Sequence, residues 1–198
     1  LSEVYKAKKN NETKELYNNW YNSYENELLR NGYITHIRCA EAINRNATNK
    51  QASILDIGCG TGLSGQAILS KGFVKIDGTD FSTKMLEKAA EKNIYQELFF
   101  IDLNTDNYNL NKKYDIICAA GVISPNHAKP ETINYFQKYL NKKGLMVFSL
   151  NDHAVEDANF MKKIQFVINK NKLKIIEKKY GDHLVRIQLR SWIYVLQK

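Results

Sequence analysis

The chain has 198 residues, of which 43% are hydrophobic and 25% charged, so it is long enough for one globular domain with a substantial core. It contains no apolar run of membrane-spanning length and no apolar N-terminal segment of the signal-peptide kind, so we expect no membrane association and a cytoplasmic location. The net charge of +8 comes mainly from 24 scattered lysines against five arginines, and this distribution does not predict a nucleic-acid-binding surface.

The cysteines and histidines do not indicate a metal site. Cys39, Cys59 and Cys118 are odd in number and share no ligand-like spacing, which is typical of small buried residues in a reducing compartment. The four histidines form no cluster along the sequence. We therefore expect no bound metal.

Residues 1–49 are predicted to form an N-terminal helical segment. Apolar and aromatic residues recur at helical spacing between Glu12 and Arg30, Gly32 interrupts them, and a second amphipathic pattern follows from Tyr33 to Asn46. The segment either packs against the rest of the chain or forms a lid over a site. With residues 50–198 it is expected to make one structural domain.

The stretch from Ile54 to Gly65 is predicted to be a strand, a glycine turn and the start of a helix. The apolar run from Ser53 to Ile57 has the length of a buried strand, and four glycines follow before a helical pattern that ends near Ser70. Such a turn lets the backbone approach a nucleotide-like ligand closely.

This glycine turn fits two patterns. Gly60 to Gly65 satisfies G-x-G-x-x-G, with Asp80 at the spacing of a dinucleotide-binding acid, which would indicate NAD. The same stretch reads D-x-G-x-G-x-G from Asp56, with an acid on the strand itself. The glycines alone leave both interpretations open.

The next strands end on acidic or small residues. A strand from Phe73 to Thr79 ends at Asp80, one from Leu98 to Ile101 ends at Asp102, and one from Tyr114 to Ala119 runs into small residues. Between the first two of these strands, Ser82 is a predicted helix N-cap. Ligands of open α/β sheets bind at the carboxyl ends of strands, so these ends predict a binding site.

The remaining chain is predicted to continue the alternation of strands and helices and to end in two consecutive strands. The expected elements are a helix, a strand, a helix and two strands around Gly181-Asp182, covering Glu131–Leu140, Leu145–Leu150, Val155–Asn169, Lys172–Tyr180 and Arg186–Gln197. The predicted fold is α/β, with three layers and a doubly wound seven-stranded sheet that is mostly parallel and ends in an antiparallel hairpin.

From Leu16 to Lys198 the sequence resembles the class I S-adenosylmethionine-dependent methyltransferases. The D-x-G-x-G-x-G stretch resembles their motif I, G-T-D-F-S-T-K-M-L-E-K-A resembles the motif that follows it, and the terminal hairpin fits their sheet. Several strings, including N-I-Y-Q and G-V-I-S, also resemble the narrower Williams–Beuren syndrome region methyltransferase-like group. The resemblance implies S-adenosylmethionine as cofactor and S-adenosylhomocysteine as product.

The resemblance also implies which residues hold the cofactor. Two tyrosines of the N-terminal segment would cover it, the motif I acid and loop would hold its methionine part and ribose, and the acids at the two later strand ends would bind the ribose and the adenine amino group. In chain order these residues are Tyr17, Tyr24, Asp56, Gly58, Cys59, Gly60, Thr61, Gly62, Asp80 and Asp102. Phe81 and Met85 would pack on the adenine, Leu103 would add a backbone contact, and Ala120 would leave space beside the methionine.

No catalytic residue stands out from the sequence. If the reaction needs a general base, the candidates are His127 and His153. We expect a small-molecule methyl acceptor. A protein that binds the cofactor without transferring the methyl group, or a NAD-dependent oxidoreductase, are the alternatives.

Overall fold

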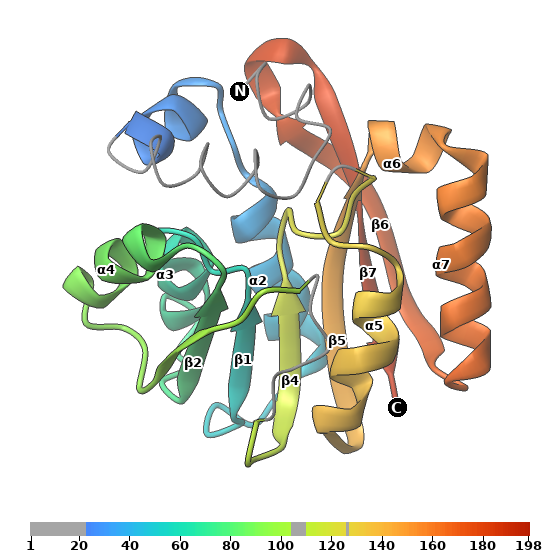
Figure 1. Ribbon diagram of the computed structural model, residues 1–198, viewed down its shortest axis with the longest axis horizontal. Coiled ribbons are helices and arrows are strands. Elements are labelled where there is room, and N and C mark those ends of the chain that lie inside the picture. Colours follow the sequence, from blue (N-terminus) through green and yellow to red (C-terminus); the bar gives the residue numbers. More distant parts are fainter. Residues whose placement is uncertain (1–22, 104–109, 126) are drawn as a thin grey trace.

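The computed structural model describes residues 23–103, 110–125 and 127–198. Its centre is a seven-stranded sheet in the order β3-β2-β1-β4-β5-β7-β6 (Figure 1). The strands are β1 Ile54–Ile57, β2 Ile76–Asp80, β3 Leu98–Phe100, β4 Tyr114–Ala119, β5 Leu140–Asn151, β6 Lys174–Leu184 and β7 Leu189–Gln197.

The strand directions confirm the predicted fold class. The neighbours from β3 through β5 pair in parallel, whereas β7 pairs antiparallel with both β5 and β6. The order reverses at β1 and β4, which lie side by side in the middle of the sheet. A doubly wound sheet binds ligands outside the carboxyl ends of its strands at such a reversal.

Helices cover both faces of the sheet and bury two separate apolar clusters (Figure 1). Side chains of α2 and α3 belong to one cluster, and side chains of α5 and α7 belong to the other. The helices are α2 Thr35–Asn46, α3 Leu63–Leu69, α4 Thr83–Glu91, α5 Glu131–Phe136, α6 Asp152–Glu156 and α7 Ala158–Lys170, with short 3-10 helices at Gln137–Tyr139 and Val185–Ile187. Residues 23–30 are also helical.

The alternation along β1 determines where its acidic side chain lies. Leu55 and Ile57 belong to the cluster beneath α5 and α7, and Ile54 belongs to the cluster beneath α2 and α3. Because successive side chains of a strand point to opposite faces, Asp56 shares the face of Ile54. Its carboxylate therefore lies on the side of the sheet that α3 covers.

The prediction of one continuous helix from Val155 to Asn169 is wrong. The structure has α6 and α7 in its place, separated at Asp157. The Asp157 carboxylate accepts hydrogen bonds from the backbone N–H groups of Asn159 and Phe160, both at 3.0 Å, and so begins a new helix. The predicted helix from Glu131 to Leu140 is also shorter, because a 3-10 turn replaces its last residues before β5.

The predicted hairpin is right, but its turn lies elsewhere. β6 continues through Gly181 and Asp182, and the chain turns at Val185–Ile187 and Gln188. A Cβ on Gly181 would lie 3.0 Å from the guanidinium of Arg38, so this glycine makes room for a side chain of α2.

Within the described residues, none of the helices combines the length and the apolar character that crossing a membrane requires. The helix α2 packs against α3, β5 and β7. The division of the chain near residue 49 and the lid role of the first segment stay predictions.

Candidate functional site

The loop between β1 and α3 is held in a conformation that favours glycine. Gly58, Gly60 and Gly62 have φ values of +60°, +54° and +93°. A Cβ on Gly58 would lie 2.6 Å from a methyl of Val122, whereas a Cβ on Gly60 would meet, among the described residues, only Tyr24, at 3.8 Å. The loop is therefore packed tightly on one side and roomy at Gly60, where a ligand can approach the backbone.

Asp56 lies beneath this loop and is completely buried. Its Oδ2 accepts hydrogen bonds from the Ser64 hydroxyl at 2.5 Å and the Tyr95 hydroxyl at 2.8 Å. Its Oδ1 has no hydrogen-bond partner within the described part of the chain. Burial raises the pKa of Asp56 to about 6, because the charged form loses its hydration.

A second unpartnered oxygen belongs to the loop itself. The Thr61 hydroxyl is buried and, among the described residues, has no hydrogen-bond partner. Buried polar atoms without a partner are uncommon in native proteins. Together with the roomy side of Gly60, the free oxygens of Asp56 and Thr61 fit a ligand that brings its own hydrogen-bond donors.

Asp80 connects the end of β2 to the glycine loop. Its Oδ2 accepts a hydrogen bond from the Gly60 backbone N–H, and its Oδ1 accepts one from the Ser82 N–H, both at 2.9 Å. Burial raises its pKa to about 6 as well. Ser82 caps α4 as predicted, by accepting a hydrogen bond from the Met85 N–H at 3.3 Å. Asp80 thus fixes the shape of the loop and the start of α4.

The other predicted cofactor residues follow the strand ends. Cys59 is buried, so its thiol does not face solvent, and its backbone N–H donates a hydrogen bond to the Thr79 carbonyl. Met85 is buried on α4. The half-buried residues Phe81, Asp102, Leu103 and Ala120 follow β2, β3 and β4. The structure brings all of these residues to the carboxyl edge of the sheet.

The N-terminal segment reaches the loop through Tyr24, which is half-buried and packs beside Leu28, Leu184 and Leu189. Glu25 on the same helix forms an ion pair with Lys92 at 2.9 Å, just after α4. Tyr17 lies outside the described residues.

The two histidine candidates differ in their surroundings. His127 is half-buried between β4 and α5, and burial lowers its pKa to about 4, so its imidazole is neutral at physiological pH. His153 is exposed on α6. In the part of the chain that the structure describes, no three His, Cys, Asp or Glu side chains gather closely enough to hold a metal ion.

Sequence reasoning missed Tyr95 as a site residue. Its hydroxyl reaches Asp56, and a Cβ on Gly65 would lie 2.4 Å from that hydroxyl, so glycine on α3 makes room for it. Tyr95 belongs to the N-I-Y-Q string, but nothing in that string indicates a contact with a carboxylate 39 residues earlier.

Sequence reasoning also missed a cluster beside the end of β4, formed by the half-buried Tyr33 and the buried His36 and His183. The Tyr33 ring stacks on His36 at 5.0 Å and meets the His183 ring edge-on at 5.4 Å. The Tyr33 hydroxyl lies 3.5 Å from the Ala120 carbonyl, and a Cβ on Gly121 would lie 2.8 Å from it. The cluster joins α2, β6 and the carboxyl end of β4.

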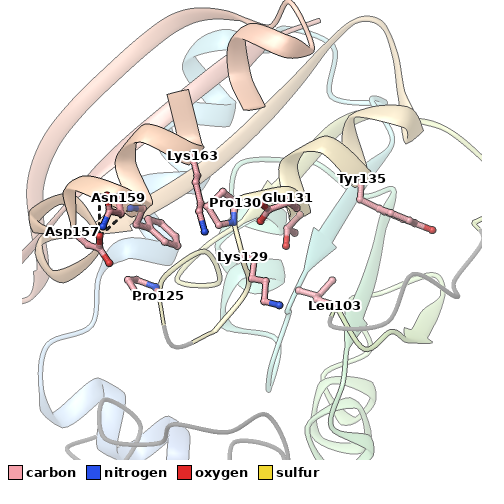
Figure 2. Close-up of a pocket in the computed structure, with 11 residues that line it drawn as sticks. Leu103, Pro125, Lys129, Pro130, Glu131, Tyr135, Asp157, Asn159 and Lys163 are labelled. Carbon is pink, nitrogen blue, oxygen red and sulfur yellow. Dashed lines mark hydrogen bonds between the residues drawn. The ribbon is translucent and has the colours of Figure 1, made fainter. Parts of the chain in front are cut away.

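A cavity of about 640 Å³ opens at the same edge of the sheet, on the face that α5 and α7 cover (Figure 2). Its described lining comes from the ends of β3 and β4, from α5 and from the start of α7. The residues are Leu103, Pro125, Lys129, Pro130, Glu131, Thr132, Tyr135, Asp157, Asn159, Phe160 and Lys163. Neither histidine candidate is among them.

Comparison with known proteins places this geometry in a family. The family model described as a methyltransferase domain matches residues 33–192. A malonyl-[acyl-carrier protein] O-methyltransferase 1 from Ilyobacter polytropus is 36% identical over 104 residues, which are 52% of this chain and 39% of that protein. Methyltransferase-like protein 27 from Homo sapiens is 34% identical over 85 residues, 40% of this chain and 35% of that protein. The chain thus spans about two fifths of the length of these curated relatives.

Solved structures show the same fold. The magnesium protoporphyrin IX methyltransferase from Synechocystis, crystallised with bound S-adenosylhomocysteine, superimposes with a TM-score of 0.67. The two chains are 16% identical, and the similarity covers 93% of this chain and 99% of that one. At this identity the similarity confirms the fold.

Proposed function

Because the chain belongs to the family of methyltransferase domains, we propose that it is a class I enzyme that transfers a methyl group from S-adenosylmethionine to a small-molecule acceptor. The observation that carries the proposal is the glycine loop, with its roomy backbone at Gly60 and the buried, unpartnered oxygens of Asp56 and Thr61. The loop lies inside the region that the family model matches.

In this proposal Asp56 and Thr61 accept hydrogen bonds from the methionine part of the cofactor. Asp80 keeps the loop in place and accepts hydrogen bonds from ribose hydroxyls, while Asp102 accepts one from the adenine amino group. Phe81 and Met85 form the apolar wall for the adenine, with Leu103 and Ala120 beside it. Tyr24 covers the loop, and Tyr17 stays a predicted part of this cover.

When bound, the cofactor supplies an activated methyl group on its sulfonium. The residues of the chain then have to align a nucleophilic atom of the acceptor and exclude water. If the acceptor must lose a proton, neither histidine stands out as the base: burial lowers the pKa of His127 to about 4, which weakens it as a base near neutral pH, and neither His127 nor His153 is among the described residues that line the cavity. Transfer without such a base stays open for an acceptor that is already ionised.

The names of the relatives suggest one kind of acceptor. The Ilyobacter polytropus relative is described as acting on malonyl-[acyl-carrier protein] as an O-methyltransferase. A carboxyl group on a small acyl chain is therefore one candidate for this protein. Membership of the Williams–Beuren syndrome region methyltransferase-like group is a narrower proposal, supported by the similarity to methyltransferase-like protein 27.

The test is calorimetric titration with S-adenosylmethionine, S-adenosylhomocysteine and NAD. We expect the first two to bind and NAD not to bind. Asp80→Asn should weaken S-adenosylhomocysteine by about tenfold or more, because a hydrogen bond to a charged group contributes about 1.5–3 kcal/mol, and Asp102→Asn should weaken it as well. The control is Glu87→Gln on α4, an acid whose side chain is 59% exposed, and it should bind as the wild type does.

Binding of NAD alone would contradict the proposal. Tight binding of S-adenosylmethionine without methyl transfer to any acceptor in a broad screen would instead favour a cofactor-binding protein that is not an enzyme.

A further inference from the structure

The cavity beside α5 and α7 lies at the carboxyl edge of the sheet. Leu103 and Pro125 in its lining follow the ends of β3 and β4, and the glycine loop follows the end of neighbouring β1. Parallel strands bring these ends to one edge of the sheet. The cavity and the proposed cofactor site therefore share this edge.

Two lysines reach this cavity from different elements. Figure 2 shows Lys163 projecting from α7 toward the segment that holds Pro130, and Lys129 projecting from that segment toward Leu103. Neither lysine has a carboxylate within ion-pair distance in the described part of the chain. Their positive charges are therefore available to a ligand.

The acidic residues of the lining are placed differently. The Asp157 carboxylate accepts two backbone N–H groups at the start of α7, and Glu131 lies in the first turn of α5. Backbone N–H groups at a helix N-terminus offset negative charge. Helix N-termini thus offset the negative charges of the lining, whereas the positive charges of the two lysines have no such compensation.

Apolar side chains form another part of the wall. Leu103, Pro125, Pro130 and Phe160 contribute carbon surface between the charged groups, and Thr132 and Tyr135 add hydroxyls. A cavity of about 640 Å³ is in the range of small-molecule sites. Its lining suits a molecule with an apolar body and a negatively charged group.

We propose that this cavity holds the methyl acceptor and that Lys129 and Lys163 bind an oxyanion of it, a carboxylate or a phosphate. The inference rests on the proposed methyltransferase function and specifies its substrate class as an anionic, partly apolar small molecule. Lysine binds such groups as a point charge.

The test is a titration followed by backbone amide NMR, with S-adenosylhomocysteine present at saturation. The probes are malonate, inorganic phosphate and, as an uncharged control, glycerol. We expect malonate and phosphate to shift amide signals of residues that line the cavity, and glycerol to leave them unchanged. The variant Lys129→Gln/Lys163→Gln should bind the anions at least about fivefold more weakly, because each lost charge removes an electrostatic attraction to the anion.

The matched control is Lys162→Gln, which removes an exposed charge from the neighbouring position of α7 outside the cavity lining. It should bind the anions as the wild type does. Unchanged affinity for S-adenosylhomocysteine in all variants shows that they are folded. Stronger binding of malonate indicates a carboxylate acceptor, and stronger binding of phosphate indicates a phosphate ester.

Anion shifts that do not cluster at the cavity, or equal affinity in the double variant and the wild type, would overturn the inference. The proposed function fails by a different result, which is the absence of S-adenosylhomocysteine binding in the wild type. The anion titration can then be made without S-adenosylhomocysteine, so the two failures are distinguishable.

Discussion

Two buried carboxyl groups beside the glycine loop, Asp56 and Asp80, lie without a lysine or arginine partner in the described part of the chain. Burial raises the pKa of each to about 6, from an ordinary value near 4. Between about pH 4 and pH 6 the folded chain therefore binds more protons at these groups than the unfolded chain does. Their contribution to the free energy of unfolding falls as the pH rises through this window, because ionisation of a buried carboxyl costs energy.

A cofactor that donates hydrogen bonds to these carboxylates favours their ionised forms. We therefore expect the affinity for S-adenosylhomocysteine to be constant above about pH 7 and to fall by about tenfold or more between pH 6 and pH 5. Calorimetric titration at pH 5, 6, 7 and 8 measures this change. In Asp56→Asn the pH dependence should be shallower, because one of the two titrating groups is gone. An affinity that does not change from pH 5 to pH 8 would contradict this assignment of the two acids.

Contacts between residues that are far apart in the sequence could not be predicted from it. The acids at the strand ends and the glycine loop were predictable, because strand ends and left-handed turns have local signals. The contact of Tyr95 with Asp56 and the contact of Thr35 with His183, 148 residues apart, have no local signal. Both form only when separate elements pack together.

At the scale of the elements, the existence of the strands and helices was predicted more reliably than their ends: β5, for example, begins at Leu140 and not at the predicted Leu145. The apolar periodicity from Val155 to Asn169 continues across Asp157, and this residue could equally have belonged to the polar face of one helix. Its role as a cap depends on the backbone leaving the helical conformation there, with φ −77° and ψ 96°. Similarly, Gly181-Asp182 is a common turn sequence, but here the glycine makes space for Arg38 while Gln188 adopts a φ of +55° at the actual turn.

The cap at Asp157 leads to a prediction for α7. Asp157→Ala should lower the free energy of unfolding by about 1 kcal/mol, because two backbone N–H groups lose their acceptor. Asp157→Asn should retain most of the stability, since asparagine caps helices about as well as aspartate. Urea unfolding of both variants measures the difference. Equal losses in the two variants would show that the negative charge, and not the cap, stabilises this helix end.

At the scale of the whole molecule, α2 joins the N-terminal part of the chain to the last two strands. The Arg38 guanidinium donates hydrogen bonds to the carbonyls of Lys179, Asp182 and Ser191, at 2.7 to 3.2 Å, and to the Ser191 hydroxyl at 2.8 Å. Nearby, Ile34 donates its backbone N–H to the His183 carbonyl at 3.1 Å. The same region positions Tyr33 against the end of β4, so this attachment also shapes the edge that holds the proposed site.

Arg38→Gln should therefore destabilise the protein by about 2 kcal/mol, because the half-buried guanidinium loses charge-assisted hydrogen bonds to three carbonyls and to the buried Ser191 hydroxyl. Arg45→Gln is the matched control, since Arg45 also joins α2 to β6, through Glu177, but with a side chain that is 41% exposed. An exposed ion pair contributes at most about 1 kcal/mol, so this variant should lose less stability. Urea unfolding compares the two. If Arg45→Gln loses as much stability as Arg38→Gln, the attachment of α2 depends on net charge between the elements and not on the hydrogen bonds of Arg38.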